Sequence, residues 1–446
     1  MTSETLISFL QTQRWFGGKA RPVADVRILD EGPLVDGRAW LAIVETRFRD
    51  GGAERYFVPL AETRDAAILV DAVADDEACR TLVDVLESGA AIHLARGRLR
   101  ASVGTSLPAG LPKAATLPVR RAAADQSNTS VLFGDELIMK VFRRVERGIN
   151  PEVEISRFLT ARGFTRVPAL VADAEYESDA PAADGTGGSS SVLMLQQFVP
   201  NHGTAWQAML ADGSDASLAL ADILGRRTGE LHEALASDTI DPAFAPERLS
   251  SDDLDAVAVG MRTFGARQLD LLRRATVADA TRAVAHRVLE RQDALLGRFD
   301  RMRRVAQPGS RIRCHGDYHL GQTLVTDGDV CILDFEGEPA RSLAERRAKS
   351  SPLRDVAGML RSFSYAAEAS GRGETWEQAV GAAFLSGYRA ATAHADFLPE
   401  TAESFAVMLD AFVLDKTLYE LGYELNNRPD WVHLPLTALA RVRTPV

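Results

Sequence analysis

The segment that decides the fold is Cys314-His315-Gly316-Asp317-Tyr318-His319-Leu320-Gly321-Gln322-Thr323-Leu324, followed by Val330-Cys331-Ile332-Leu333-Asp334-Phe335-Glu336-Gly337-Glu338-Pro339. The first stretch follows a short apolar segment, and its residues are typical of a loop. The second is a short apolar run that stops abruptly at acidic residues, which is the pattern of a buried strand that ends in a carboxylate. A turn sequence, Thr326-Asp327-Gly328-Asp329, lies between them, so we expect the two stretches to face each other across a turn.

The polar residues of these stretches have the types and the order that phosphoryl transfer from a nucleotide requires. One carboxylate must orient the attacking hydroxyl and accept its proton, and oxygen ligands must hold Mg²⁺ on the phosphates. We therefore predict Asp317 as the catalytic residue, Gln322 and Asp334 as Mg²⁺ ligands, and Glu336 as a further candidate ligand. Protein kinases use the order H-x-D, Asn, D-F-G. A simple His-Gly-Asp turn with a capping Asp is the alternative, but it does not account for the amide and the acids that follow.

Length and composition describe an ordinary globular protein of two or three domains. The chain has 446 residues, of which 46% are hydrophobic and 25% charged. Its net charge of -11 argues against nonspecific binding to nucleic acid or to an anionic membrane. The three cysteines lack metal-ligand spacing and the even count of a disulfide scaffold, and neither a membrane span nor a signal peptide is evident. We expect a cytoplasmic monomer without nucleic-acid or membrane partners.

A lysine upstream of the catalytic stretch is predicted to contact the nucleotide. Lys140 stands between apolar residues on a predicted strand, where a kinase-like fold keeps its phosphate-pairing lysine. Asn150 and Pro151 then mark the start of a helix. This helix offers two carboxylates to pair with the lysine, and we prefer Glu154 to Glu152.

Two further segments are predicted to surround the nucleotide. No glycine-rich phosphate loop is present, and its place is taken by Gln126, Ser127, Asn128, Thr129 and Ser130, whose side chains and N–H groups would cover the phosphates. An ordinary hairpin turn is the alternative for this run. The apolar strand that starts at Val192 leads into the expected hinge segment, whose backbone groups would contact adenine. This segment consists of Gln196, Gln197, Phe198 and Val199.

The helices of the C-terminal half include a candidate sugar-binding stripe. We expect long amphipathic helices at residues 218–235 and 278–306, and a last long helix that carries residues 415–431. On that helix Lys416, Glu420 and Glu424 recur at i, i+4, with Tyr419, Tyr423 and Arg428 beside them. Acids, aromatic rings and an arginine on one stripe suit a polyhydroxylated sugar, with His315 and Arg354 completing the site; a solvated face held by Lys–Glu pairs is the alternative.

With these motifs in hand, the sequence resembles the actinobacterial maltokinases, which are similar in fold to aminoglycoside phosphotransferases and other eukaryotic-like kinases. The resemblance runs nearly end to end and is carried by residues 13–19, 125–130, 140–144, 148–151, 315–322, 334–339, 351–358 and 415–429. It implies an α+β, bilobal, protein-kinase-like fold. A β-rich N-terminal cap subdomain would span residues 1–90, an intermediate ATP-binding subdomain 91–200, and a mostly helical C-lobe with the catalytic loops and the sugar site 201–446.

The resemblance also implies an activity and its partners. Mg²⁺-ATP would phosphorylate maltose at its reducing-end anomeric hydroxyl, and the maltose 1-phosphate would feed α-glucan (glycogen) synthesis, with trehalose synthase as a candidate partner. Related chains of this build phosphorylate glucosamine, so a glucosamine or other aminosugar kinase is the alternative. A catalytically silent nucleotide-binding regulator is a second alternative, which the retained lysine, amide and acids disfavour.

Overall fold

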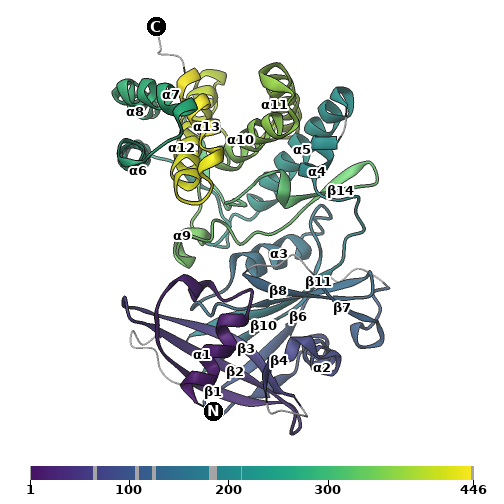
Figure 1. The fold of residues 1–446 in the computed structure, drawn as a ribbon. Coiled ribbons are helices and arrows are strands. Elements are labelled where there is room, and N and C mark those ends of the chain that lie inside the picture. Colours follow the sequence, from purple (N-terminus) through teal and green to yellow (C-terminus); the bar gives the residue numbers. More distant parts are fainter. Residues whose placement is uncertain are drawn as a thin grey trace. The chain divides into compact units, whose positions relative to one another are not determined.

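The chain divides after Pro200 into two units, Met1–Pro200 and Asn201–Val446. The computed structural model describes residues 2–63, 68–105, 110–122, 127–179, 188–211 and 213–442, and Figure 1 labels their helices and strands. The mixture of sheets and helices confirms the α+β class predicted from the sequence. The three domain ranges given above stay a prediction.

The first unit begins with a helix packed on an antiparallel sheet. The elements are α1 (Ser3–Thr12), β1 (Val23–Val35), β2 (Ala39–Phe48), β3 (Ala53–Glu62) and β4 (Leu69–Asp71), with the strands in the order β1-β2-β3-β4. Leu6, Phe9 and Leu10 of α1 pack with Trp15 and Phe16 against one face of the sheet. The other face joins a core shared with the next helix and sheet.

A second, seven-stranded antiparallel sheet completes the first unit. Its order is β5-β6-β10-β11-β9-β8-β7, with α2 (Asp76–Ser88) and α3 (Pro151–Ala161) as the accompanying helices. The strands are β5 (Ala91–His93), β6 (Gly97–Val103), β7 (Val119–Arg121), β8 (Asn128–Phe133), β9 (Leu137–Phe142), β10 (Leu170–Ser178) and β11 (Ser189–Gln197). Met139 and Val141 on β9 are fully buried in the core, which fixes the strand face that carries Lys140.

The second unit is mostly helical, as expected. Its helices are α4 (Ala205–Ala211), α5 (Ser214–Leu235), α6 (Ser251–Arg274), α7 (Asp279–Glu290), α8 (Gln292–Leu296), α9 (Leu343–Arg347), α10 (Leu353–Ser370), α11 (Gly373–Ala391), α12 (Ala402–Asn427) and α13 (His433–Arg441). Helices α5 and α11 approach so closely that a Cβ atom at Gly387 would lie 2.2 Å from the carbonyl oxygen of Asp222. Among the described residues, no helix is both long and apolar enough to cross a membrane.

Short strands in the second unit carry the catalytic stretch. Strands β14 (Thr323–Thr326) and β15 (Asp329–Ile332) pair antiparallel, with Thr326 opposite Asp329, so the predicted turn is confirmed. The remaining pair is β12 (Glu247–Arg248) with β13 (Ser310–Arg311).

The predicted single helix at residues 278–306 is wrong. The chain leaves helical geometry at Arg291, where α7 ends, and α8 ends at Gly297 before a 3₁₀ turn, Phe299–Arg304. Phe299 and Met302 in this turn are fully buried. The breaks let these side chains reach the core, a tertiary effect that the apolar periodicity does not show.

Candidate active site

The loop that carries Asp317, the predicted catalytic residue, is held by a buried histidine. The ring Nε2 of His315 donates a hydrogen bond to the carbonyl oxygen of Leu333, 2.7 Å away, and Nδ1 accepts one from the N–H of Asp317 at 3.4 Å. The ring also packs on Phe335, with centroids 4.9 Å apart. Because His315 is only 1% exposed and both ring nitrogens are engaged, its predicted contact with the sugar is wrong. It instead fixes the catalytic loop against the strand that carries Asp334.

A buried carboxylate on α10 positions the same loop. Asp355 accepts hydrogen bonds from the N–H groups of His315 at 2.7 Å and Gly316 at 2.9 Å, and His232 lies 3.2 Å from it. Gly316 has a φ of 87°, which favours glycine at this turn. Burial by itself would raise the pKa of Asp355, but the hydrogen bond from His232 and the loop N–H groups lower it overall. A charged Asp355 therefore holds the backbone on either side of the peptide that leads to Asp317.

The predicted metal ligands of the second unit form a suitable oxygen donor set. The amide nitrogen of Gln322 donates to Asp334 Oδ2 at 2.8 Å, so the amide oxygen is available as an acceptor. Asp334 has a φ of 64°, a left-handed conformation that is strained for a residue other than glycine and is common at functional sites. Asp334 and Glu336 are both partly exposed. Carboxylate and amide oxygens are ligands that Mg²⁺ accepts, so these residues fit that ion.

In the first unit, the lysine pairs with a different glutamate from the one preferred above. Lys140 Nζ lies 2.6 Å from Glu152 Oε2, so the choice of Glu154 is corrected. Glu152 shares the buried face of α3 with Ile155 and Leu159, at i+3 and i+7, whereas Glu154 is rotated about 200° from it. Asn150 caps the helix as predicted, accepting a hydrogen bond from the N–H of Glu152 at 2.8 Å.

The expected phosphate-covering residues lie mostly in a strand. Asn128, Thr129 and Ser130 belong to β8, with Ser130 opposite Lys140 on β9, whereas Ser127 precedes the strand. Gln126 lies outside the described residues. The part of this run that forms a loop is therefore shorter than predicted, and its contact with nucleotide stays a prediction.

A fully buried arginine fixes one of these strand residues. Arg143 donates from Nε to Thr129 Oγ1 at 2.9 Å and pairs with Asp71 at 2.6 Å. Trp15 donates from its indole N–H to the same Asp71 carboxylate at 3.1 Å. The four-stranded sheet is thereby linked to the strand that carries the predicted phosphate contacts.

At the predicted hinge, β11 ends at Gln197. The N–H of Gln197 donates to the carbonyl oxygen of Ala169 at 2.9 Å, and the N–H of Phe198 donates to that of Glu136 at 2.7 Å. These two donors are therefore engaged within the unit. The adenine contact predicted for residues 196–199 stays a prediction.

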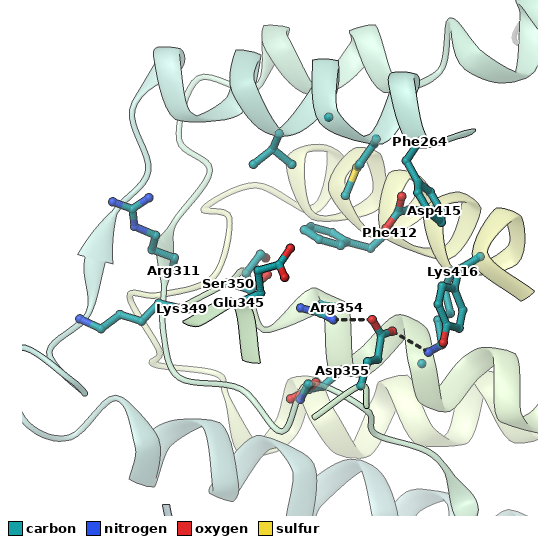
Figure 2. A pocket seen from close by; sticks show the side chains of 18 of the residues that line it. Phe264, Arg311, Glu345, Lys349, Ser350, Arg354, Asp355, Phe412, Asp415 and Lys416 are labelled. Atoms are coloured by element: carbon teal, nitrogen blue, oxygen red, sulfur yellow. Dashed lines mark hydrogen bonds and ion pairs between the residues drawn. The ribbon is translucent and has the colours of Figure 1, made fainter. Parts of the chain in front are cut away.

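The second unit contains a cavity of about 640 Å³ that reaches Asp317 (Figure 2). Helices α6, α10 and α12 and the loops around Gly316 and Glu338 supply its walls. The predicted residues that line it are Asp317, Arg354, Lys416 and Tyr419. Phe264, Phe412 and Met261 add apolar surface. A cavity of this size falls within the roughly 300–1,000 Å³ typical of small-molecule sites.

Ion pairs connect Asp317, the predicted catalytic residue, to its neighbours in this cavity. Lys416 Nζ lies 3.4 Å from Asp317 and 3.1 Å from Glu338, and Arg354 lies 3.2 Å from Glu338. Figure 2 marks the ion pairs of Arg354 and Lys416 with dashed lines. Burial by itself would lower the pKa of Lys416, but the charges of Asp317 and Glu338 raise it overall. Burial would likewise raise the pKa of Glu338, but Lys416, Arg354 and Arg341 lower it to about 2. Lys416 and Glu338 are therefore both charged near neutral pH.

The rest of the predicted stripe on α12 does not face the cavity. Glu420 is buried against Arg361, 2.7 Å away, and Glu424 is buried between Arg428 at 2.7 Å and the hydroxyl of Tyr365 at 2.9 Å. Tyr423 is 44% exposed. These contacts overturn the prediction that Glu420 and Glu424 surround the sugar together with Lys416; the sugar contacts predicted for Tyr423 and Arg428 stay a prediction. The contacts of Glu420 and Glu424 hold α12 against α10 and close its C-terminal end.

Sequence reasoning missed four residues of the site: Glu338, Arg341, Asp355 and Asp415. Glu338 belongs to the acidic end of the decisive stretch, but nothing local distinguishes it from Glu336. Asp415 stands four residues before Tyr419, so helical spacing could have placed both on one face. Asp355 contacts partners far along the chain and leaves no local signal, whereas Arg341 pairs with Glu338, three residues before it.

The fold and the site define a phosphotransferase: the chain belongs to the phosphotransferase enzyme family, whose model matches residues 118–394. Residues 9–75 match the maltokinase N-terminal cap domain. The resemblance to maltokinase-like chains of the aminoglycoside phosphotransferase fold is thereby confirmed.

Known relatives and a solved structure agree with this fold. A glucosamine kinase of Mycolicibacterium smegmatis is 27% identical over 342 residues, which cover 72% of this chain and 78% of that protein. A glucosamine kinase of Streptacidiphilus jiangxiensis is 26% identical over 348 residues, 71% of each. The structure of a glucosamine kinase in complex with glucosamine, ADP and inorganic phosphate superimposes with a TM-score of 0.71 at 20% identity and covers 98% of each chain. The bilobal kinase-like fold is confirmed by this likeness.

Proposed function

We propose that the protein transfers the γ-phosphoryl group of ATP to a hydroxyl group of a neutral sugar, with maltose as the first candidate. The observation that carries this proposal is the cavity at Asp317. Its wall contains six carboxylates and six cations, so the wall as a whole has no net charge. Aromatic and apolar side chains line the same space, as expected for a ligand that presents both hydroxyl groups and C–H faces.

In the proposed reaction, Asp317 orients the acceptor hydroxyl and takes its proton. Lys416, 3.4 Å away, keeps the carboxylate in place, and Asp355 fixes the backbone of the loop. Lys140, oriented by Glu152, would bind phosphate oxygens of the nucleotide. Gln322, Asp334 and Glu336 would hold Mg²⁺, which when bound neutralises charge on the phosphates.

Maltose is supported by two observations. The cap model matched by residues 9–75 is that of maltokinases. The cavity of about 640 Å³ also exceeds what a single sugar ring requires, within the usual range of about 300–1,000 Å³ for ligand sites. The product would be maltose 1-phosphate, which would supply α-glucan synthesis, and trehalose synthase would be a natural supplier of maltose.

Glucosamine is the second candidate, because the relatives reported above are named glucosamine kinases. The two candidates differ in charge at neutral pH, so the neutral wall favours maltose. Initial rates with Mg²⁺-ATP against maltose, glucosamine, glucose and kanamycin, with NMR of the product, test the proposal. Maltose 1-phosphate is the expected product. Phosphorylated glucosamine without turnover of maltose would assign the second function, and binding of Mg²⁺-ATP without turnover of any acceptor would contradict both.

A further inference from the structure

Five of the six carboxylates that line the cavity are already engaged by the protein. Asp317 and Glu338 pair with cations, Asp355 accepts backbone N–H groups, and Asp253 and Glu345 complete the capping boxes of α6 and α9. The sixth, Asp415, has no hydrogen-bond or ion-pair partner among the residues that the structure describes. Figure 2 shows it in the same part of the cavity as Phe264 and Phe412, with Lys416 following it on α12.

A carboxylate in such a position is costly for the fold. Asp415 is partly buried and its carboxylate faces the cavity; a polar group with reduced hydration and no protein partner is seldom retained unless it serves a function. The charged groups near it are Arg354 of α10, Arg341 and Glu338 of the preceding loop, and Lys416 of α12. Burial nevertheless raises the pKa of Asp415 to about 6, against the influence of the arginines, because none of these groups contacts its oxygens. The acceptor for a hydrogen bond is therefore present and unused.

We propose that Asp415 is a specificity-determining residue of the acceptor site, whose carboxylate accepts a hydrogen bond from a hydroxyl group of a neutral sugar. This assignment rests on the function proposed above. A hydroxyl group suits the position because the charges of the wall already balance when Asp415 is ionised. An ammonium group would add a positive charge beside Lys416 and Arg354.

Two substitutions separate the hydrogen bond from the charge. Asp415→Ala removes both, whereas Asp415→Asn keeps an acceptor oxygen in a side chain of the same shape. With maltose we expect Asp415→Ala to raise KM roughly tenfold to a hundredfold, as for loss of a hydrogen bond to a charged group, while KM for ATP stays the same. Asp415→Asn should recover most of this loss, to within about fivefold of the unsubstituted protein. Glu403→Gln, at an exposed carboxylate of the same helix, is the matched control and should change neither constant.

The possible outcomes distinguish this assignment from the proposed function. An unchanged KM for the acceptor in Asp415→Ala, in a protein that phosphorylates sugar, would overturn the assignment alone. If glucosamine is the only substrate and both variants raise its KM equally, the carboxylate binds an ammonium group. This result would also overturn the assignment. If the unsubstituted protein phosphorylates no sugar in the panel, the proposed function fails, and the assignment fails with it.

Discussion

Replacing Asp355 with asparagine should disable the catalytic loop while leaving the nucleotide contacts intact. The carboxylate accepts the N–H groups of His315 and Gly316 on different oxygens, at 2.7 and 2.9 Å, from a position that is 1% exposed. An asparagine has one acceptor oxygen, so in either orientation its NH₂ group faces a buried N–H. One hydrogen bond to a charged group, about 1.5–3 kcal/mol, is lost, and a buried donor is left unsatisfied at about 1–3 kcal/mol.

The expected loss in free energy of unfolding is therefore about 2.5–6 kcal/mol. Because the loop carries Asp317, a displacement of about 1 Å should also lower kcat roughly 10²-fold. Urea denaturation followed by two probes gives the first quantity, and saturating steady-state rates give the second. Glu368→Gln, at a half-exposed carboxylate on the same helix, is the control and should shift stability by less than about 0.5 kcal/mol.

The pH dependence provides a second check on the same variant. The pKa of Asp355 is lower in the folded protein than in the unfolded chain, so its stabilising contribution is complete above the unfolded value of about 3.9. It is lost only as the pH falls through the lowered value. The difference between Asp355→Asn and the unsubstituted protein should stay constant from about pH 5.5 to 8 and shrink in acid. A variant that is equally stable and equally active would refute the role given to Asp355.

Three further predictions address the catalytic residue, the lysine partner and the cavity acid. Asp317→Asn should lower kcat by at least roughly 10²-fold with KM for ATP nearly unchanged; equal losses in both would contradict its role as base. Glu152→Gln should raise KM for ATP more than Glu154→Gln does, because Glu152 lies 2.6 Å from Lys140 Nζ on the buried face of its helix; steady-state titration of ATP decides this. The pKa of Asp415, about 6, is above its unfolded value, so its ionisation costs stability at neutral pH, and this cost disappears as the pH falls. Asp415→Asn should therefore be about 1–3 kcal/mol more stable than the unsubstituted protein at pH 7.5 and equally stable near pH 4, measured by urea denaturation.

The catalytic hairpin could be predicted from the sequence because its signals are local. An apolar run that stops at Asp334, an Asp-Gly turn before it, and the order of Asp317 and Gln322 all lie within a few residues of one another. The cap of α3 at Asn150 was predictable for the same reason. Such features depend on strand and helix-end chemistry rather than on distant contacts.

The sequence could not predict which residues of α12 face the cavity, because the helix is buried on more than one face. Lys416 and Glu420 are one turn apart, yet Lys416 lines the cavity and Glu420 meets Arg361, which is 59 residues away in the chain. Helical spacing places both on one stripe and cannot say which neighbour each one meets. The choice between Glu152 and Glu154 failed similarly, since it depends on which face of α3 is buried.

The place of α12 in the chain has a consequence for biosynthesis. The ion pair between Lys416 and Asp317 joins residues 99 positions apart, and α12 also supplies Asp415 and Tyr419 to the cavity. A nascent chain whose catalytic hairpin has already left the ribosome therefore still lacks one wall of the acceptor cavity. The cavity is therefore complete only after α12 has been synthesised and has docked against α6 and α10.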